Sequence, residues 1–253
     1  MSDAQIAQRV LRCLDLTDLT DNCTDQAIDA LCKKALDERG PVAAVCVWPQ
    51  FVKRSQENLK GSPVRIATVV NFPAGGEEVD RVADDVQEAL SDGASEIDLV
   101  LPYDALRRGD VTIAAEMIEA VRDLVDPGRL LKVILETGEL KDAKLIETAS
   151  RLTIDAGADF IKTSTGKTPV SATPEAAEIM LNAIKASGRP VGLKPSGGIR
   201  TLADAKLYLD LAERIMGAGW ATPQTFRIGA SSVYDALIAA IEGREGQAAT
   251  GAY

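Results

Sequence analysis

Three charged side chains in this sequence, Lys162, Lys194 and Asp98, lie at or near the carboxyl ends of short apolar segments. An unpaired charge is expensive to bury, so each of them must be paired or functional. A lysine amine attacks a carbonyl only when it is neutral, and a second cation together with partial desolvation lowers the pKa that keeps it protonated. A neighbouring carboxylate could relay protons. The pattern predicts imine formation on one of the two lysines, with the other as the second cation and Asp98 as a candidate relay.

Further charges fall on the same face of these segments under the two-residue alternation of a strand. Glu96, Lys132 and Glu136 would point inward, whereas Ile97 and Val133 would point outward. Structural ion networks also bury charged groups. We interpret Glu96, Lys132 and Glu136 as such a network rather than as catalytic groups.

The 253 residues include no histidine. Its absence excludes Ser-His and Cys-His nucleophiles, a histidine general base and histidine metal sites. The four cysteines have no CxxC spacing, which indicates reduced thiols and no zinc site. Cys46 could be a reactive thiol near a pocket, but packing as a small buried hydrophobe is the favoured interpretation. We therefore predict no metal and no cofactor.

The formal net charge is −10, which argues against nucleic acid as a partner. A small phosphorylated ligand is still compatible, because a few backbone amides and one lysine can hold a phosphate locally. No apolar run is long enough to span a bilayer, and the stretch Met1–Arg12 carries charge without the apolar block of a secretory signal. We expect a cytoplasmic protein without a membrane partner.

The elements that would position the charged residues alternate between short apolar runs and longer amphipathic segments. In the segment 77–92, for example, Val79, Val82, Val86 and Leu90 form one helical stripe. Thr173 with Pro174, and Thr201 with Asp204, are typical of helix starts. The strand candidates are 12–16, 42–48, 65–71, 96–101, 131–137, 159–163, 191–194 and 226–229.

Eight such repeats without a linker predict an α/β fold, a single (β/α)8 TIM barrel over residues 1–253 that ends in a short flexible tail from about residue 243. The alternative is an open doubly wound sheet. In a barrel, active sites lie at the carboxyl ends of the strands, which is where Lys162, Lys194 and Asp98 are expected.

Loops rich in Gly, Ser and Thr follow the last three strand candidates, at 163–167, 195–198 and 229–232. Barrels frequently bind phosphate after strands seven and eight, where small residues let backbone amides approach. Each loop alone is more typical of an ordinary turn, but three together beside two inward lysines predict a phosphate site. The segment 71–73 could also line the pocket, although such a turn more often ends a strand.

These segments closely resemble the deoxyribose-phosphate aldolase family from near residue 10 onward, with high specificity at 160–167 and 194–200. The matching stretches are Asp15–Thr17, Val45–Pro49, Ala67–Pro73, Glu96–Tyr103, Lys132–Leu140, Phe160–Lys167, Val191–Arg200 and Ile228–Ser232. The resemblance implies a (β/α)8 class I aldolase, free of metal, that reversibly cleaves 2-deoxy-D-ribose 5-phosphate to acetaldehyde and D-glyceraldehyde 3-phosphate in deoxynucleoside breakdown. A homodimer is expected by family analogy alone.

The resemblance also assigns residues. Lys162 matches the Schiff-base lysine, Lys194 the lysine that perturbs it and Asp98 the proton-relay carboxylate, while Tyr253 matches a terminal tyrosine that helps to move a proton at the acetaldehyde carbon. The residues expected at the phosphate lie in the three loops: Thr165, Gly166, Lys167, Gly197, Gly198, Ser231 and Ser232. Departures from the family pattern are Trp48, where tyrosine is expected, Leu193 for phenylalanine and Ser196 for alanine.

Two other functions compete with this prediction. One is a different Schiff-base aldolase, acting on a ketose phosphate or a keto acid, which a comparison of substrates would separate. The other is a barrel that binds a sugar phosphate without chemistry, which predicts thermal stabilisation by ligand without a covalent adduct. A binding module has no need of the costly pair of buried lysines, so the enzyme is favoured.

Overall fold

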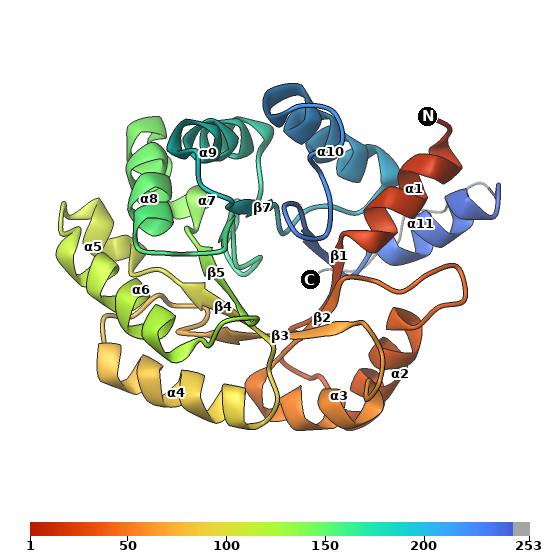
Figure 1. The fold of residues 1–253 in the computed structure, drawn as a ribbon, viewed down its shortest axis with the longest axis horizontal. Coiled ribbons are helices and arrows are strands. Elements are labelled where there is room, and N and C mark those ends of the chain that lie inside the picture. Colours follow the sequence, from red (N-terminus) through yellow and green to blue (C-terminus); the bar gives the residue numbers. More distant parts are fainter. Residues whose placement is uncertain (245–253) are drawn as a thin grey trace.

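Eight parallel strands form the centre of the protein, which is described here by a computed structural model of residues 1–244 (Figure 1). Each strand overlaps one of the eight predicted segments. The segment that starts at Phe226 becomes a strand only at Ile228, because Phe226 makes no more than an isolated bridge with Leu193. The strands are β1 Leu14–Asp18, β2 Ala44–Val47, β3 Arg65–Val70, β4 Glu96–Val100, β5 Leu130–Ile134, β6 Phe160–Lys162, β7 Gly192–Lys194 and β8 Ile228–Ala230.

The sheet closes on itself as a barrel. The hydrogen-bonded order is β7-β6-β5-β4-β3-β2-β1-β8, so β1 pairs with both β2 and β8. Isolated bridges of Leu193 with Phe226 and of Ser196 with Gly229 join β7 to β8. The predicted (β/α)8 barrel is confirmed, and the open doubly wound sheet is wrong.

Helices surround the strands as a ring (Figure 1). The additional helix α1 precedes the first strand and packs against α11. The helices are α1 Asp3–Arg12, α2 Asp25–Ala35, α3 Val52–Asn58, α4 Val79–Ser91, α5 Tyr103–Arg107, α6 Thr112–Leu124, α7 Thr137–Leu140, α8 Ala143–Asp155, α9 Pro174–Ser187, α10 Leu202–Met216 and α11 Val233–Ile241, with a 3-10 turn η1 at Pro49–Phe51.

The helix starts follow the local signals in the sequence. The Thr173 hydroxyl accepts a hydrogen bond from the N–H of Ala176 at the start of α9, with Pro174 at the first helical position. Thr201 and Asp204 form the predicted capping box of α10. Caps of this kind satisfy backbone donors that have no partner inside the helix and contribute about 1 kcal/mol each.

The two faces of the strands differ as the alternation predicts. Ile97, Leu99 and Val133 are fully buried in the large core between strands and helices, whereas the charged residues on the other face lie inside the barrel. A second, small apolar cluster lies apart from the large core and comprises Leu19, Ala44, Cys46, Ala67 and Val69. Because Val69 pairs with Asp98 in register, this cluster faces the interior charges. The barrel interior is therefore charged on one side and apolar on the other.

Most of the predicted tail, including Tyr253, lies outside the described residues, and the extent of a single domain over the whole chain stays a prediction. Within residues 1–244, none of the helices combines the length and the apolar character needed to cross a bilayer.

Candidate active site

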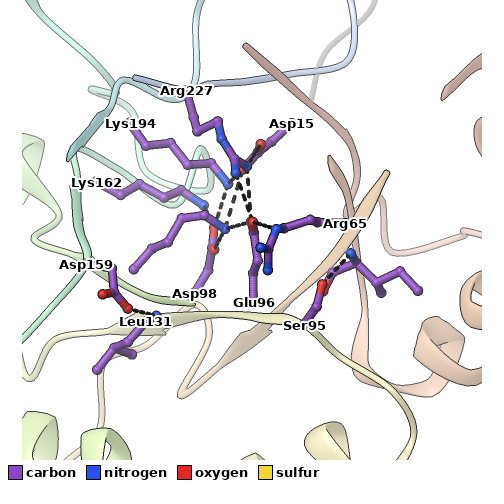
Figure 2. A network of polar contacts seen from close by, with 12 residues as sticks. Asp15, Arg65, Ser95, Glu96, Asp98, Leu131, Asp159, Lys162, Lys194 and Arg227 are labelled. Atoms are coloured by element: carbon purple, nitrogen blue, oxygen red, sulfur yellow. Dashed lines mark hydrogen bonds and ion pairs between the residues drawn. The ribbon is translucent and has the colours of Figure 1, made fainter. Parts of the chain in front are cut away.

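Asp98 is the point at which the two candidate catalytic lysines meet (Figure 2). It lies on β4, and its carboxylate accepts hydrogen bonds from the Nζ of Lys162 at 2.9 Å and of Lys194 at 2.7 Å, both at Oδ2. Its other oxygen accepts from Lys132 at 2.8 Å. The structure thus brings together the three residues that the sequence singled out, at the carboxyl ends of β6 and β7 and on β4, which lies two strands from β6 in the sheet order.

A second layer of charges lies around this centre. Lys194 also contacts Asp15 at 2.6 Å, and Lys132 contacts Glu96 at 2.5 Å. The Arg227 guanidinium joins the two acids, at 2.6 Å from Asp15 and 2.9 Å from Glu96. The interpretation of Glu96 and Lys132 as members of an ion network agrees with these contacts.

The chemistry of Asp15 and Arg227 was not predicted from the sequence, although the signal was present. Asp15 stands between Leu14 and Leu16, and Arg227 between Phe226 and Ile228. Both therefore follow the alternation that revealed the other inward charges.

The buried network contains four cationic and three anionic side chains within residues 1–244: Lys132, Lys162, Lys194 and Arg227 with Asp15, Glu96 and Asp98. An excess buried charge is costly, so the network is balanced when one lysine is neutral. Arg65 also approaches Glu96, at 3.7 Å, but its side chain is 40% exposed and is solvated.

Burial and the nearby Lys194 ammonium lower the pKa of Lys162, against the opposing effect of Asp98. Burial acts in the same direction on Lys194, but Asp15 and Asp98 outweigh it and hold the pKa of Lys194 well above its ordinary value. Asp98 stays ionised, because the three lysines overcome burial and keep its pKa well below the ordinary range. Lys162 is consequently the member of the network that is poised to be a neutral amine.

Glu136 does not belong to the ion network, and the interpretation that grouped it with Glu96 and Lys132 is wrong. It follows β5, where the chain turns out of the strand, and its carboxylate faces the loop after β6. Its hydrogen-bond partners are the N–H and hydroxyl of Thr165 and the hydroxyl of Thr168. The alternation failed here because Glu136 has a left-handed backbone, with φ 52° and ψ 60°, which ends the strand geometry.

The three Gly- and Ser-rich loops lie side by side at the carboxyl end of the barrel. A Cβ on Gly197 would lie 2.5 Å from Ser171 Oγ and 3.3 Å from Gly166 Cα, and φ at Gly197 is +83°, so only glycine fits. A Cβ on Gly229 would lie 2.6 Å from Ser196 Oγ and 3.0 Å from Lys194 Cε. The loops are therefore packed closely against one another and against the lysines.

These loops also present backbone donors. The N–H groups of Gly166, Gly198 and Ser232 have no acceptor within residues 1–244. Ser232 is the N-cap residue of α11, and Ser231 before it is exposed. Backbone donors at a helix start are suited to an anion.

The Lys167 side chain reaches away from its own loop. Its Nζ lies 3.0 Å from Asp21 and 5.8 Å from the centroid of the Trp48 ring, so it contacts the loops after β1 and β2. Trp48 in turn donates its indole N–H to the Thr20 carbonyl at 3.1 Å and packs edge-on against Phe72 at 5.4 Å.

Two further predictions, for Cys46 and for the segment 71–73, concern the apolar side of the barrel interior. Cys46 is fully buried in the small apolar cluster, and burial raises the pKa of its thiol, which agrees with packing as a small hydrophobe. In the segment 71–73, Asn71 donates its side-chain amide to the carbonyls of Gly76 and Val100, which agrees with a turn that ends the strand, and Phe72 packs against the small apolar cluster.

Comparison with known proteins gives consistent results. The model of the DeoC/LacD family aldolases matches residues 9–232. A deoxyribose-phosphate aldolase from Agrobacterium fabrum is 52% identical over 98% of this chain and 96% of that protein. A crystal structure from Coccidioides immitis, assigned as a deoxyribose-phosphate aldolase, is 32% identical with a TM-score of 0.81, over 94% of this chain and 86% of that chain. The deoxyribose phosphate aldolase from Aeropyrum pernix, described as a tetramer, is 25% identical with a TM-score of 0.76, over 94% and 92% of the two chains.

Proposed function

This chain belongs to the DeoC/LacD family of aldolases, and from that premise we propose that it reversibly cleaves 2-deoxy-D-ribose 5-phosphate to acetaldehyde and D-glyceraldehyde 3-phosphate through a Schiff base on Lys162. The observation that carries the mechanism is the charge count of the buried network, which is balanced only when one lysine is neutral. Lys162 is the lysine whose pKa is lowered.

The reaction begins on the open-chain aldehyde. The lone pair of Lys162 Nζ attacks C1, and the carbinolamine loses its hydroxyl as water to give a protonated imine. Lys194 and Asp98 are our candidates to exchange the protons that this dehydration requires, because Asp98 Oδ2 accepts hydrogen bonds from both Lys194 and Lys162.

Carbon–carbon cleavage follows from the charge that imine formation creates. The iminium adds one positive charge to a network that was balanced, so the site then holds four cations against three carboxylates. Loss of the C3 hydroxyl proton, for which Asp98 is the candidate acceptor, lets the C2–C3 electron pair flow into the iminium. The resulting enamine is neutral, and the balance returns once the proton that Asp98 has taken up leaves the site. D-glyceraldehyde 3-phosphate leaves, and protonation and hydrolysis of the enamine release acetaldehyde and free Lys162.

The phosphate supplies binding energy away from the reacting carbons. We assign it to the loops after β6, β7 and β8, with donors from Gly166, Gly198, Ser231 and Ser232. Gly197 belongs to the same site, although in this conformation its N–H donates to the Gly229 carbonyl at 3.4 Å. In this conformation Lys167 contacts Asp21, so a direct contact with phosphate requires its side chain to rotate out of that ion pair.

Borohydride trapping tests the proposal. The protein is incubated with deoxyribose 5-phosphate and reduced, and the intact mass and modified peptide are read. A stable adduct on Lys162 that is lost in Lys162→Met supports the class I mechanism, and comparison with fructose phosphates separates this substrate from a ketose phosphate. Calorimetric binding without an adduct or turnover would refute it in favour of a non-catalytic barrel.

Two finer assignments belong to the same proposal. Tyr253 would move the proton at the acetaldehyde-derived carbon, and Tyr253→Phe is then expected to slow exchange of the acetaldehyde methyl protons with deuterium in water more than it slows imine formation. A cytoplasmic homodimer is proposed by family analogy, and light scattering at several protein concentrations measures the assembly.

A further inference from the structure

We propose that Glu136 is a positioning residue that holds the loop after β6 in its phosphate-binding conformation, and that it thereby sets the preference for a phosphorylated substrate over the same sugar without phosphate. The inference rests on the proposed function, which assigns the phosphate partly to this loop. Glu136 contacts neither Lys162 nor Asp98 by any hydrogen bond or ion pair within residues 1–244.

The backbone aims Glu136 at the loop. The residue before it donates to the carbonyl of Lys162 at 2.9 Å, and the residue after it donates to the carbonyl of Thr163 at 2.9 Å. Glu136 itself takes the left-handed conformation, which is unfavourable for a residue with a side chain. Because the chain is tied to the end of β6 on both sides of this turn, the carboxylate is held against the segment that begins with the Schiff-base strand.

The carboxylate binds one loop. One oxygen accepts from the N–H of Thr165 at 3.2 Å and from its hydroxyl at 2.5 Å, and the other lies 3.2 Å from the hydroxyl of Thr168. The Thr165 hydroxyl in turn accepts from the N–H of Lys167 at 3.0 Å. Within residues 1–244 the fully buried Glu136 forms no ion pair with lysine or arginine, although such pairing is usual for a buried acid. Its hydrogen-bond donors within these residues all belong to the loop.

This arrangement fixes which donors remain for a ligand. Glu136 and the Thr165 hydroxyl engage the N–H groups of Thr165 and Lys167, while the N–H of Gly166 between them has no acceptor within the described residues. At Gly166 φ is +82°, a left-handed conformation that suits glycine. Gly166 is also the residue that packs against Gly197 of the loop after β7. Glu136 therefore determines where the loop presents its free donor, without contacting the phosphate itself.

Steady-state kinetics on deoxyribose 5-phosphate and on unphosphorylated 2-deoxyribose test the inference. Glu136→Leu removes both acceptors, and we expect KM for the phosphorylated sugar to rise about 10- to 100-fold, with kcat on either sugar changed less than about threefold. Glu136→Gln retains an acceptor for Thr165 and can donate to the Thr168 hydroxyl, so KM should stay within about threefold of wild type. Glu139→Leu is the matched control, because Glu139 lies on the same turn but faces Arg107 at 4.0 Å.

Inorganic phosphate, measured by calorimetry on the same variants, gives a reading that does not depend on turnover. Weaker phosphate binding in Glu136→Leu but not in Glu136→Gln supports the positioning role even if wild type fails to cleave deoxyribose 5-phosphate, an outcome that would refute the proposed function alone. Equal losses of kcat/KM on both sugars, or an unchanged KM and phosphate affinity in Glu136→Leu, would overturn the inference. If Glu136→Leu does not fold, an effect of Glu136→Gln as large on 2-deoxyribose as on its phosphate overturns it, and an effect confined to the phosphate supports it.

Discussion

Replacement of Lys194 by methionine is the sharpest test of the buried network. It removes one of four cations and leaves Lys132, Lys162 and Arg227 opposite three carboxylates. The network is then balanced only when Lys162 is protonated, so the variant is expected to convert the neutral nucleophile into an ammonium. The effect is on the charge of Lys162 rather than on its position.

The magnitude follows from the geometry. The Nζ atoms of Lys162 and Lys194 lie 2.9 and 2.7 Å from the same Asp98 oxygen, so they are at most about 5.6 Å apart, the sum of those distances. Two like charges at about 5.6 Å repel by about 3 kcal/mol at an effective dielectric constant of about 20. Removal of the Lys194 charge therefore raises the pKa of Lys162 by about two. At pH values below both pKa values, the neutral fraction of Lys162 falls about 100-fold.

The assay is the pH dependence of borohydride trapping with acetaldehyde, which reports imine formation directly. In Lys194→Met the alkaline midpoint should move up by about two pH units, so that much of the lost rate returns at high pH. Lys194→Arg keeps the charge and serves as control, with its midpoint near that of wild type. An equal loss of rate at every pH, with no change of midpoint, would refute the reasoning and assign Lys194 to positioning Asp15 and Asp98.

Three further predictions concern stability and the loops. Arg227→Met leaves Asp15 and Glu96 short of a buried cation, and the free energy of unfolding in urea should fall by about 3 to 5 kcal/mol; a loss below about 1 kcal/mol would argue against a buried pair. The pKa values of Asp15 and Asp98 are held below the ordinary 3.8, so these folded-state groups contribute stability above about pH 4 that is lost as pH falls further, and urea midpoints measured between pH 6 and pH 3 should fall. In Gly197→Ala the new Cβ would clash with Ser171, so this variant should lower Tm and raise KM for the phosphorylated sugar more than Gly198→Ala does. At Gly198 φ is similar, at +80°, but no atom lies within 4 Å of the added Cβ. Equal effects of the two variants would show that backbone strain alone is responsible.

Much of the fold was predictable because the sequence shows two periodicities, the two-residue alternation of strands and the apolar stripe of amphipathic helices. Strand alternation separated Ile97 and Leu99 from Glu96 and Asp98, and helical stripes such as that of α4 filled the intervals. Parallel strands place their carboxyl ends at one rim, so the meeting of Lys162 and Lys194 followed from topology.

The remainder depended on conformations that local sequence does not encode. Glu136 leaves the strand through a left-handed residue that is not glycine, so the alternation assigned it to the wrong partners. Lys167 has a long side chain, and its ion pair with Asp21 connects residues 146 positions apart in sequence. Arg227 follows the alternation of its predicted segment, but its partners Asp15 and Glu96 lie 212 and 131 positions away in sequence. Each of these depends on the contacts of a loop rather than on the period of an element.

The order of the interior charges along the chain has a consequence for assembly. All three carboxylates come from β1 and β4, in the first half of the barrel, whereas all four cations follow in the second half, from β5 to the start of β8. Each half-barrel alone would enclose charges of one sign. A half-barrel cannot close with a copy of itself without burying like charges, but the two different halves attract one another. A chain divided between β4 and β5 should therefore reassemble from its fragments as a heterodimer, with electrostatic complementarity favouring the correct pairing.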